Sequence, residues 1–278
     1  MLSKENIQQE IVEAVKEVKA TTPLVGSITN VITIDFVANA QLAAGGSAAM
    51  VYMGEEGAAL AQAGRAFYIN MGSLLPVHEE GVITTARAAR EAGVPWVLDP
   101  VGIGIGSMRS TLLRELKAEK PSIIRCNASE AIALAHEWGL ETQGAAGDVK
   151  GVDSTETVSE ARAAAISLAK WTDGAVTVSG EVDLITDGEL VAHSSGGSTL
   201  MGKVTGFGCS LGGVVAVYAA SGTPFIAALS GVNAYNLAAT RAQAKATGPA
   251  SFKVAFIDEL YNASAVDIAQ NPFTLEEA

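Results

Sequence analysis

Short apolar runs rich in branched side chains alternate with longer segments of helical period along most of this chain. This alternation is typical of β–α–β units, in which the strands are buried on both faces of a parallel sheet and helices cover those faces. The predicted strands are Leu24–Ile28, Ala48–Tyr52, Ala66–Asn70, Trp96–Leu98, Ile123–Arg125 and Ala175–Val178. Because crossovers between parallel strands are right-handed, the carboxyl ends of these strands meet at one edge of the sheet. The sequence therefore predicts an α/β fold with a mostly parallel central sheet.

The segments between and after these strands carry the helical period. They predict helices over Ile34–Ala44, Ala58–Ala63, Val77–Glu91, Met108–Glu119, Glu130–Trp138, Glu156–Trp171, Gly208–Ala220, Pro224–Ala246 and Val254–Ser264. The pattern changes after Ser179, since two β-prone runs, Val182–Thr186 and Glu189–His193, flank the dipeptide Asp187-Gly188. Asp-Gly between such runs is a strong hairpin signal, so we expect an antiparallel extension of the sheet.

Length and composition favour one well-packed domain. The chain has 278 residues, 49% of them hydrophobic and 17% charged, which supports a large buried core and argues against disorder. An α/β domain of about 250 residues is common as one unit. No internal repeat or Pro/Ser-rich linker divides the chain, and Glu141–Ser154 is interpreted as a polar loop. We predict a single domain over residues 1–278.

Charge and cysteine content exclude several classes of function. The net charge is −12, and no Lys/Arg cluster is present that would neutralise a nucleic-acid backbone, so nucleic acid is a poor partner. The first 22 residues alternate charged and apolar side chains and lack the apolar core of a signal peptide. The two cysteines, Cys126 and Cys209, do not form a disulfide framework. We expect a cytoplasmic protein.

A long stretch without charged residues, Val204–Thr240, has the length of a membrane span. Glycines, Ser221-Gly222 and Pro224 divide it into apolar pieces shorter than the roughly 20 residues that a bilayer requires. Two buried helices are the preferred interpretation, and we expect no membrane association.

The run VTGFGCSLGG, Val204–Gly213, predicts a glycine turn that opens a helix. Glycine adopts positive φ readily, and the first amides of a helix have no internal partner and lie at the positive end of its dipole. Such a turn binds anions. The run Arg125–Glu130 places a cation, an amide and a carboxylate at the start of another predicted helix. Together the two runs indicate phosphoryl transfer.

The residues that follow the predicted strands are unusually polar, and in open α/β sheets ligands bind at this edge. Asp99 follows the fourth strand and Glu130 opens the helix after the fifth. Two carboxylates with substrate phosphates are a usual Mg²⁺ site. Two structural explanations stay open: an Asp-Pro pair often ends a strand, and Glu130 is spaced to complete a helix-capping pair with Asn127.

Arg125 and Cys209 each allow two interpretations. The planar guanidinium of Arg125 suits phosphate oxygens, although an ordinary ion pair is the structural alternative. Cys209 is either a small buried hydrophobic residue or, at a helix N-terminus that lowers a thiol pKa, a group able to accept a proton from a substrate hydroxyl. The three histidines show no metal-ligand spacing, and Gly102–Gly106 lacks the full dinucleotide fingerprint.

In these residues the chain resembles the hydroxyethylthiazole kinases, ribokinase-like enzymes of thiamine biosynthesis and salvage. The resemblance covers nearly the whole length. The motifs that carry it are Pro23-Leu24-Val25 with Thr29-Asn30, Ala49-Met50-Val51, Leu98–Gly102, Ile124-Arg125 with Asn127–Glu130, Gly151-Val152-Asp153, Ser179–Asp183 and Gly206–Cys209.

The resemblance implies a three-layer αβα fold without a lid domain and ATP-dependent phosphorylation of the hydroxyl of 4-methyl-5-(2-hydroxyethyl)thiazole. It places Met50, Gly206 and Asn30 at the alcohol, Arg125, Ser179 and Asn127 at the nucleotide, and Asp99 and Glu130 at Mg²⁺. Cys209 takes the place of the aspartate that most ribokinase-like enzymes carry, and the amides from Gly206 through Gly208 to Cys209 stabilise transferring charge. With no lid, the resemblance implies a homotrimer whose subunits close one another's sites.

Departures from the family pattern and competing functions leave alternatives open. Cys126 replaces a common glycine, and Phe207, between two glycines, either narrows the pocket or packs outward. One competing function is an ATP- or ADP-dependent dehydratase of hydrated nicotinamide cofactors, against which Cys209 argues. A kinase of the hydroxymethylpyrimidine of the same pathway and a non-catalytic nucleotide-binding module are the others.

Overall fold

The computed structural model describes residues 3–140 and 158–278. Their strands form one nine-stranded sheet in the order β2-β1-β3-β4-β5-β6-β7-β8-β9. The strands are β1 (Leu24–Ile28), β2 (Ser47–Met50), β3 (Ala66–Asn70), β4 (Trp96–Asp99), β5 (Ile123–Asn127), β6 (Ala175–Ser179), β7 (Asp183–Thr186), β8 (Leu190–Ser194) and β9 (Phe273–Glu277). Strands β1 to β6 pair in parallel, which confirms the predicted α/β fold with a mostly parallel sheet.

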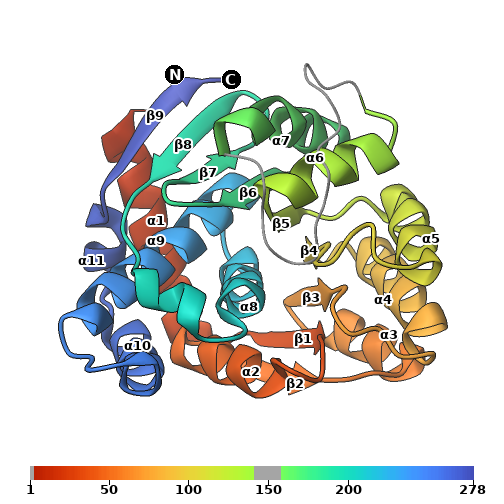
Figure 1. Ribbon diagram of the computed structural model, residues 1–278, viewed down its shortest axis with the longest axis horizontal. Helices are drawn as coiled ribbons and strands as arrows, with labels where there is room; N and C mark the ends of the chain where they lie inside the picture. The colour runs from red at the N-terminus through yellow and green to blue at the C-terminus, as the bar shows by residue number, and fades with distance from the viewer. Residues whose placement is uncertain (1–2, 141–157) are drawn as a thin grey trace.

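Helices cover both faces of the sheet and give three layers (Figure 1). One layer holds α1 (Lys4–Thr21), α2 (Ile34–Ala43), α8 (Phe207–Ala219), α9 (Pro224–Gln243), α10 (Pro249–Asn262) and α11 (Ala265–Gln270). The other holds α3 (Gly54–Ala63), α4 (His78–Ala92), α5 (Ser107–Leu116), α6 (Ala128–Glu137) and α7 (Val158–Thr172). Each layer packs its own hydrophobic core against the sheet.

The predicted change of pattern after Ser179 is confirmed, because β7 and β8 pair antiparallel across the Asp187-Gly188 turn. Gly188 adopts φ +94°, a conformation that glycine takes without strain. Strand β7 also pairs antiparallel with β6, so the hairpin extends the parallel sheet. Strand β9, which the sequence pattern did not predict, pairs antiparallel with β8 at the edge of the sheet.

Several element boundaries differ from the predicted ones. Strand β2 ends at Met50 rather than Tyr52, and α3 begins at Gly54, four residues before the predicted start. Helix α10 begins at Pro249, and the short helix η2 (Thr199–Lys203) precedes the glycine turn. The predicted loop Glu141–Ser154 and the motif Gly151-Val152-Asp153 lie outside the described residues.

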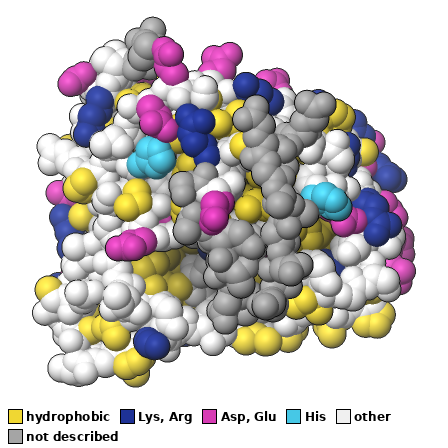
Figure 2. Space-filling view, turned by 45° about the horizontal axis from the view of Figure 1, so that its top comes forward, with side chains coloured by type: hydrophobic (Ala, Val, Ile, Leu, Met, Phe, Trp, Pro, Cys, Tyr) yellow, Lys and Arg dark blue, Asp and Glu magenta, His cyan; other side chains and the backbone are white. Residues whose placement is uncertain are grey.

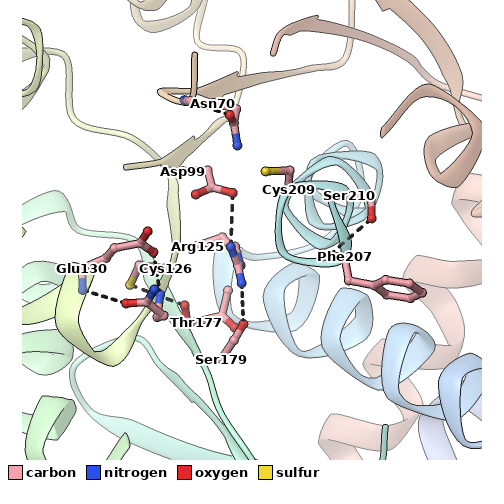
Figure 3. Close-up of polar contacts among 12 residues, drawn as sticks. Asn70, Asp99, Arg125, Cys126, Glu130, Thr177, Ser179, Phe207, Cys209 and Ser210 are labelled. Carbon is pink, nitrogen blue, oxygen red and sulfur yellow. Dashed lines mark hydrogen bonds and ion pairs between the residues drawn. The ribbon is translucent and has the colours of Figure 1, made fainter. Parts of the chain in front are cut away.

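The uncharged stretch Val204–Thr240 contains α8 and the greater part of α9, whose residues are almost all buried. Neither these two helices nor any other described helix combines the length and the apolar composition needed to cross a membrane. Helix α8 packs against β3, β4 and α2, and α9 packs against α8. The first turn of α8 thereby lies at the edge where the parallel strands end (Figures 1 and 3).

Candidate active site

The glycine turn forms as predicted and opens α8. Gly206 is the N-cap residue with φ +98°, and a Cβ at this position would lie 2.9 Å from Cγ2 of Thr33. The first intrahelical bond of this turn runs from the N–H of Ser210 to the carbonyl of Gly206, at 2.8 Å. The amides of the preceding residues, including Gly208 and Cys209, therefore belong to the open first turn of a helix, the usual geometry for binding an anion.

Phe207 is buried, and its ring packs into an aromatic cluster, although the residue also lines the pocket described below. Its ring contacts those of Phe36, Tyr235, Phe252 and Phe256 at centroid distances between 4.8 and 5.9 Å. Figure 3 shows the ring pointing away from the polar groups of the site. The Tyr235 hydroxyl donates to the Phe207 carbonyl at 2.7 Å, so the aromatic cluster holds the backbone of the turn in place.

Arg125 joins the strand ends to the turn (Figure 3). Its Nη1 lies 3.4 Å from Oδ2 of Asp99, and its Nη2 donates to Oγ of Ser179 at 3.0 Å. A Cβ on Gly208 would lie 2.8 Å from Nη1, so the guanidinium lies directly against the glycine turn. The ion pair that the sequence allowed as the structural alternative is present, and it lies inside the site rather than on the surface.

Asn127 and Glu130 form the helix-capping pair that the spacing allowed. Oδ1 of Asn127 accepts the N–H of Glu130 at 2.9 Å, and Oε2 of Glu130 accepts the N–H of Asn127 at 2.9 Å. Oε1 of Glu130 accepts the N–H of Gly102 at 3.4 Å. Glu130 is thus a capping residue whose carboxylate also lies beside Arg125 and Asp99 (Figure 3).

Burial raises the cost of ionising both carboxylates, and the Asp99 charge adds to that cost at Glu130. Burial raises the pKa of Glu130 to about 7, and the Asp99 charge adds to the effect against the opposing Arg125. Burial likewise raises the pKa of Asp99, while Arg125 and the Tyr68 hydroxyl oppose it. For Arg125, burial lowers the pKa, but the neighbouring Asp99 and Glu130 more than offset it, so the net shift is upward. A further cation at this place would relieve the repulsion.

The carboxylate pair fits a hard divalent cation. Oδ1 of Asp99 is buried and has no hydrogen-bond partner among the described residues, although its other oxygen is well bonded. Asp99 and Glu130 supply two hard oxygen donors, and Mg²⁺ is usually held by one or two carboxylates together with substrate phosphates and water. No group of three or more His, Cys, Asp or Glu residues able to hold a metal occurs in residues 3–140 and 158–278.

Of the two interpretations of Cys209, the structure does not favour a lowered thiol pKa. Burial raises the pKa of the thiol, and the Asp99 carboxylate raises it further against the opposing Arg125 charge. The first turn of α8 does stabilise a thiolate, but loss of water and the nearby negative charge outweigh it. Cys209 therefore carries a neutral thiol at neutral pH.

Two residues of β3 belong to the site although the sequence analysis did not single them out. The Tyr68 hydroxyl lies 3.0 Å from Oδ2 of Asp99 and 2.7 Å from the carbonyl of Cys209, and it accepts a bond from Nδ2 of Asn70 at 2.9 Å. Nδ2 of Asn30 donates to Oδ1 of Asn70 at 3.0 Å and lies 3.5 Å from Sγ of Cys209. Asn70 ends the third strand, so the same inspection of strand ends would have found it.

The predicted alcohol-binding residues occupy the side of the site nearest β1 and β2. Asn30 is buried after β1, and its Oδ1 also accepts the amides of Ile32 and Thr33. Gly206 faces Thr33 across the loop. Met50 ends β2, the outer strand of the sheet, where it is aligned with Ser27 of β1. The structure thus brings Asn30 and Gly206 to Cys209 and leaves Met50 one strand further out.

A pocket of about 890 Å³ opens on the other side of the turn, over β6, β7 and α9. Arg125, Ser179 and Gly208 line it, with further contributions from Gly180, Asp183, Gly196, Gly197, Ser198, Met201, Tyr235 and Asn236. A cavity of this size accommodates a ligand as large as a nucleotide. Two of the three predicted nucleotide residues line the pocket, whereas Asn127 serves as the cap of α6.

Comparisons with known proteins assign the chain to a family. The model of the Hydroxyethylthiazole kinase family matches residues 15–265. The chain belongs to the hydroxyethylthiazole kinase family. The hydroxyethylthiazole kinase of Bifidobacterium longum subsp. infantis is 45% identical, over 97% of this chain and 92% of that protein.

Solved structures of other proteins support this family assignment. That of the hydroxyethylthiazole kinase protein from Pyrococcus horikoshii OT3 superimposes with a TM-score of 0.85 at 29% identity, over 97% of this chain and 99% of that chain. Pyridoxal kinase from Staphylococcus aureus shares the fold, with a TM-score of 0.57 at 15% identity over 78% of this chain and 88% of that one. The expected ribokinase-like fold is confirmed, and a member of the hydroxyethylthiazole kinase family is a kinase.

Proposed function

We propose that this chain, as one kinase domain over residues 1–278, transfers the γ-phosphoryl group of ATP to the hydroxyl of 4-methyl-5-(2-hydroxyethyl)thiazole, a reaction of thiamine biosynthesis or salvage. The main support for this proposal is the position of the first turn of α8. It lies between a nucleotide-sized pocket and the group formed by Asn30 and Cys209. ATP in the pocket, as the phosphoryl donor, and the alcohol on the other side, as the acceptor, would meet at the open amides of this helix turn. The names of the related kinases support this choice of substrates.

In the proposed mechanism, the alcohol lies beside Asn30, Gly206 and Met50 and attacks the γ-phosphorus in line. The bond from that phosphorus to the bridging oxygen breaks, ADP leaves, and the hydroxyl proton passes to an oxygen of the transferred phosphoryl group. The amides from Gly206 through Gly208 to Cys209 stabilise the charge on the transferring group, and Arg125 with Ser179 orients the phosphates. Asn127 contributes indirectly, because it fixes the start of α6 and with it Glu130. Phosphoryl transfer depends mainly on positioning and electrostatics, so a neutral thiol at Cys209 is compatible with turnover.

Asp99 and Glu130 are the residues proposed to hold Mg²⁺. When bound with the nucleotide, the ion would supply positive charge to the β- and γ-phosphate oxygens. The protein's own part is to hold the two carboxylates rigid: the Tyr68 hydroxyl and Arg125 fix Asp99, and the amides of Asn127 and Gly102 fix Glu130.

The proposed assembly is a cytoplasmic homotrimer in which a neighbouring subunit closes each site. The segment between β1 and β2 is fully described and consists of α2 and its turns, so it forms no lid. Exposed hydrophobic side chains on the loops after β1, β2, β3 and β4 support contact with another subunit at this edge; they are Val31, Ile32, Met53, Leu75, Val77 and Ile105. On the face drawn in Figure 2, Lys and Arg side chains are scattered among Asp and Glu, which is in keeping with a small-molecule substrate rather than a nucleic acid.

The test is ADP release with Mg-ATP and the thiazole alcohol, against a blank without alcohol and against the hydroxymethylpyrimidine. Turnover with the thiazole alone supports the proposal. Turnover with the pyrimidine alone would show that the hydroxymethylpyrimidine, and not the thiazole alcohol, is the substrate. ATP binding without turnover of either alcohol would favour a binding module, and ATP- or ADP-dependent conversion of a hydrated nicotinamide cofactor would favour the dehydratase.

The magnesium assignment is tested with Glu130→Gln. A glutamine keeps the capping bond from Asn127 and loses only the longer, 3.4 Å bond from Gly102, so we expect α6 to remain in place and the protein to fold. The Mg²⁺ concentration for half-maximal rate should rise by about 10-fold or more, because one of two charged ligands is lost. An unchanged Mg²⁺ profile would contradict the assignment.

A further inference from the structure

Asp183 is a buried carboxylate in the wall of the nucleotide pocket. It begins β7 and is 7% exposed. Its Oδ1 accepts the N–H of Gly180 at 2.9 Å, and its Oδ2 accepts Nδ2 of Asn236 at 2.8 Å. No ion pair of the described residues includes it, so two neutral donors satisfy this charge. Burying a carboxylate with only neutral partners costs free energy, because the charge loses its hydration. A residue that only filled space at this position would not need a charged side chain.

Gly180 stands in the turn between β6 and β7, next to Ser179. The Ser179 hydroxyl accepts Nη2 of Arg125 at 3.0 Å. The bond from Gly180 to Asp183 therefore fixes the backbone on one side of a residue that bonds Arg125. A shift of this turn would move the Ser179 hydroxyl and remove one of the two partners that aim the guanidinium.

Asn236 connects the same carboxylate to a second loop of the pocket. It lies on α9, and its backbone carbonyl accepts the N–H of Gly197 at 3.2 Å. Thr240, one turn further along α9, also receives that N–H at Oγ1, at 3.0 Å. Gly197 belongs to the loop between β8 and η2 that lines the pocket. Helix α9 thus holds the β8–η2 loop directly and the β6–β7 turn through Asp183.

We propose that Asp183, paired with Asn236, is a positioning residue for the nucleotide: it fixes the β6–β7 turn to α9 so that Ser179 and Arg125 meet the phosphates in one arrangement. The proposal rests on the proposed function only in that the pocket binds ATP. It assigns a role to the last residue of the Ser179–Asp183 motif, which the mechanism above does not use. The alcohol subsite lies on the other side of α8 and is not part of this pair.

The pair allows a swap experiment. In Asp183→Asn, the new amide cannot accept from both Gly180 and Asn236, because one of its two polar atoms is a donor. We expect Kd and KM for Mg-ATP to rise by about 10- to 100-fold, the range for losing a hydrogen bond to a buried charge. KM for the alcohol should stay within about twofold, since its subsite is separate. Asn236→Asp places two carboxylates together and should weaken ATP binding at least as much.

The double variant Asp183→Asn with Asn236→Asp restores a donor opposite a carboxylate. We expect it to recover ATP affinity to within about threefold of the wild type, a non-additive result that only a direct pair produces. The matched control is Asp187→Asn, just after β7 and outside the pocket. Its carboxylate also accepts two hydrogen bonds, in this case both at Oδ1 and both from backbone N–H groups, those of Glu189 and Leu190. Its ATP affinity should equal that of the wild type.

ATP binding is measured by calorimetry without alcohol, beside KM for each substrate, kcat and the melting temperature. Lower melting temperature with unchanged ATP affinity would overturn the proposal and leave Asp183 a structural residue. A swap variant that folds but binds ATP no better than the single variants would also overturn it. If the double variant does not fold, the single variants Asn236→Ala and Asp183→Asn test the proposal instead. Each must raise Kd for ATP in folded protein, and an unchanged Kd in either would overturn the proposal. Wild-type protein that binds ATP without thiazole turnover would refute the proposed function alone.

Discussion

At the scale of single residues, the acidity of Cys209 depends on which of two opposing effects is larger. The start of a helix favours a thiolate, while burial and a nearby carboxylate disfavour it. Here the second effect prevails, and the pKa of the thiol is raised. The residue therefore contributes contact with Asn30 and an open amide rather than a strong base.

Cys209→Ala should lower kcat by only about 3- to 10-fold, because a neutral thiol is not the group that removes the proton, whereas a positioned general base is worth about 100-fold or more. KM for ATP should not change. Steady-state rates with both substrates varied check this. Loss of activity by about 100-fold or more in folded protein would mean that the thiol is the obligatory base, and Cys209→Ser distinguishes a lost contact from lost chemistry.

His78 makes stability depend on pH. Its Nδ1 accepts the N–H of Leu75 at 2.8 Å, and burial lowers its pKa below the 6.5 of an exposed histidine. As the pH falls below about 6.5, the unfolded chain gains a proton at His78 before the folded chain does. This contribution to the free energy of unfolding is therefore present above pH 6.5 and is lost as the pH falls.

His78→Asn keeps an acceptor for Leu75 but cannot titrate, so we expect a smaller loss of stability between about pH 7 and pH 5.5 than in the wild type. Urea unfolding midpoints across this range measure the difference. His136→Asn on the exposed face of α6 is the control. Identical pH profiles for His78→Asn and the wild type would show that another group carries the acid sensitivity.

At the scale of elements, the contact between α8 and β5 depends on a glycine. Gly208 has ordinary helical geometry, so its importance lies in space rather than in backbone conformation: a methyl group would lie 2.8 Å from Nη1 of Arg125. The guanidinium has little room to withdraw, because Asp99 and Ser179 hold it from two sides.

Gly208→Ala should therefore raise KM for ATP and lower kcat/KM by about 10- to 100-fold, the size expected when a positioning group moves by about an ångström. Helix propensity favours alanine, so the melting temperature should fall little. Gly248→Ala, at the start of α10 with open space around its Cα, is the control. Equal kinetics for Gly208→Ala and the wild type would contradict the placement of Arg125 against the turn.

Periodicity predicted the parallel strands well because all of them except the half-buried β2 are mostly buried on both faces and have apolar sequences. It missed β9, since only Phe273 is buried there and the remaining residues, TLEE, look like a solvated tail. At the site, strand ends revealed Asp99, Arg125 and Asn30. Tyr68 was missed because a tyrosine inside an apolar strand looks like a core residue, and only the approach of α8 shows that its hydroxyl contacts Asp99. The raised thiol pKa likewise depends on burial, which spacing does not reveal.

At the scale of the whole molecule, the carboxyl edge of the sheet carries hydrophobic side chains that solvent does not favour. Ile32 is 69% exposed and Met53 is 56% exposed, on neighbouring loops after β1 and β2. Scattered exposed hydrophobic residues are ordinary, but six on loops of one edge support the proposed contact with another subunit. The proposed trimer buries them beside the alcohol subsite.

Ile32→Glu should convert the assembly from three chains to one and lower thiazole turnover by about 10-fold or more, because a charge would be buried in the contact. Light scattering with chromatography measures the number of chains. Val254→Glu on α10, 66% exposed in the wild type, is the control and should leave assembly and rate unchanged. A wild-type protein that is a single chain at working concentration would refute the trimer.

The capping pair at the start of α6 has a consequence for how this lineage can change. One carboxylate closes the first turn of a helix and, in the proposed function, also holds Mg²⁺ at the phosphates; a glutamine can fulfil the capping role but not the proposed magnesium role. A gene that acquires Glu130→Gln would still encode a well-folded protein, so selection for folding alone cannot preserve catalysis at this position. The identity of this one side chain is therefore a useful criterion for separating active descendants of the family from folded copies that have lost the reaction.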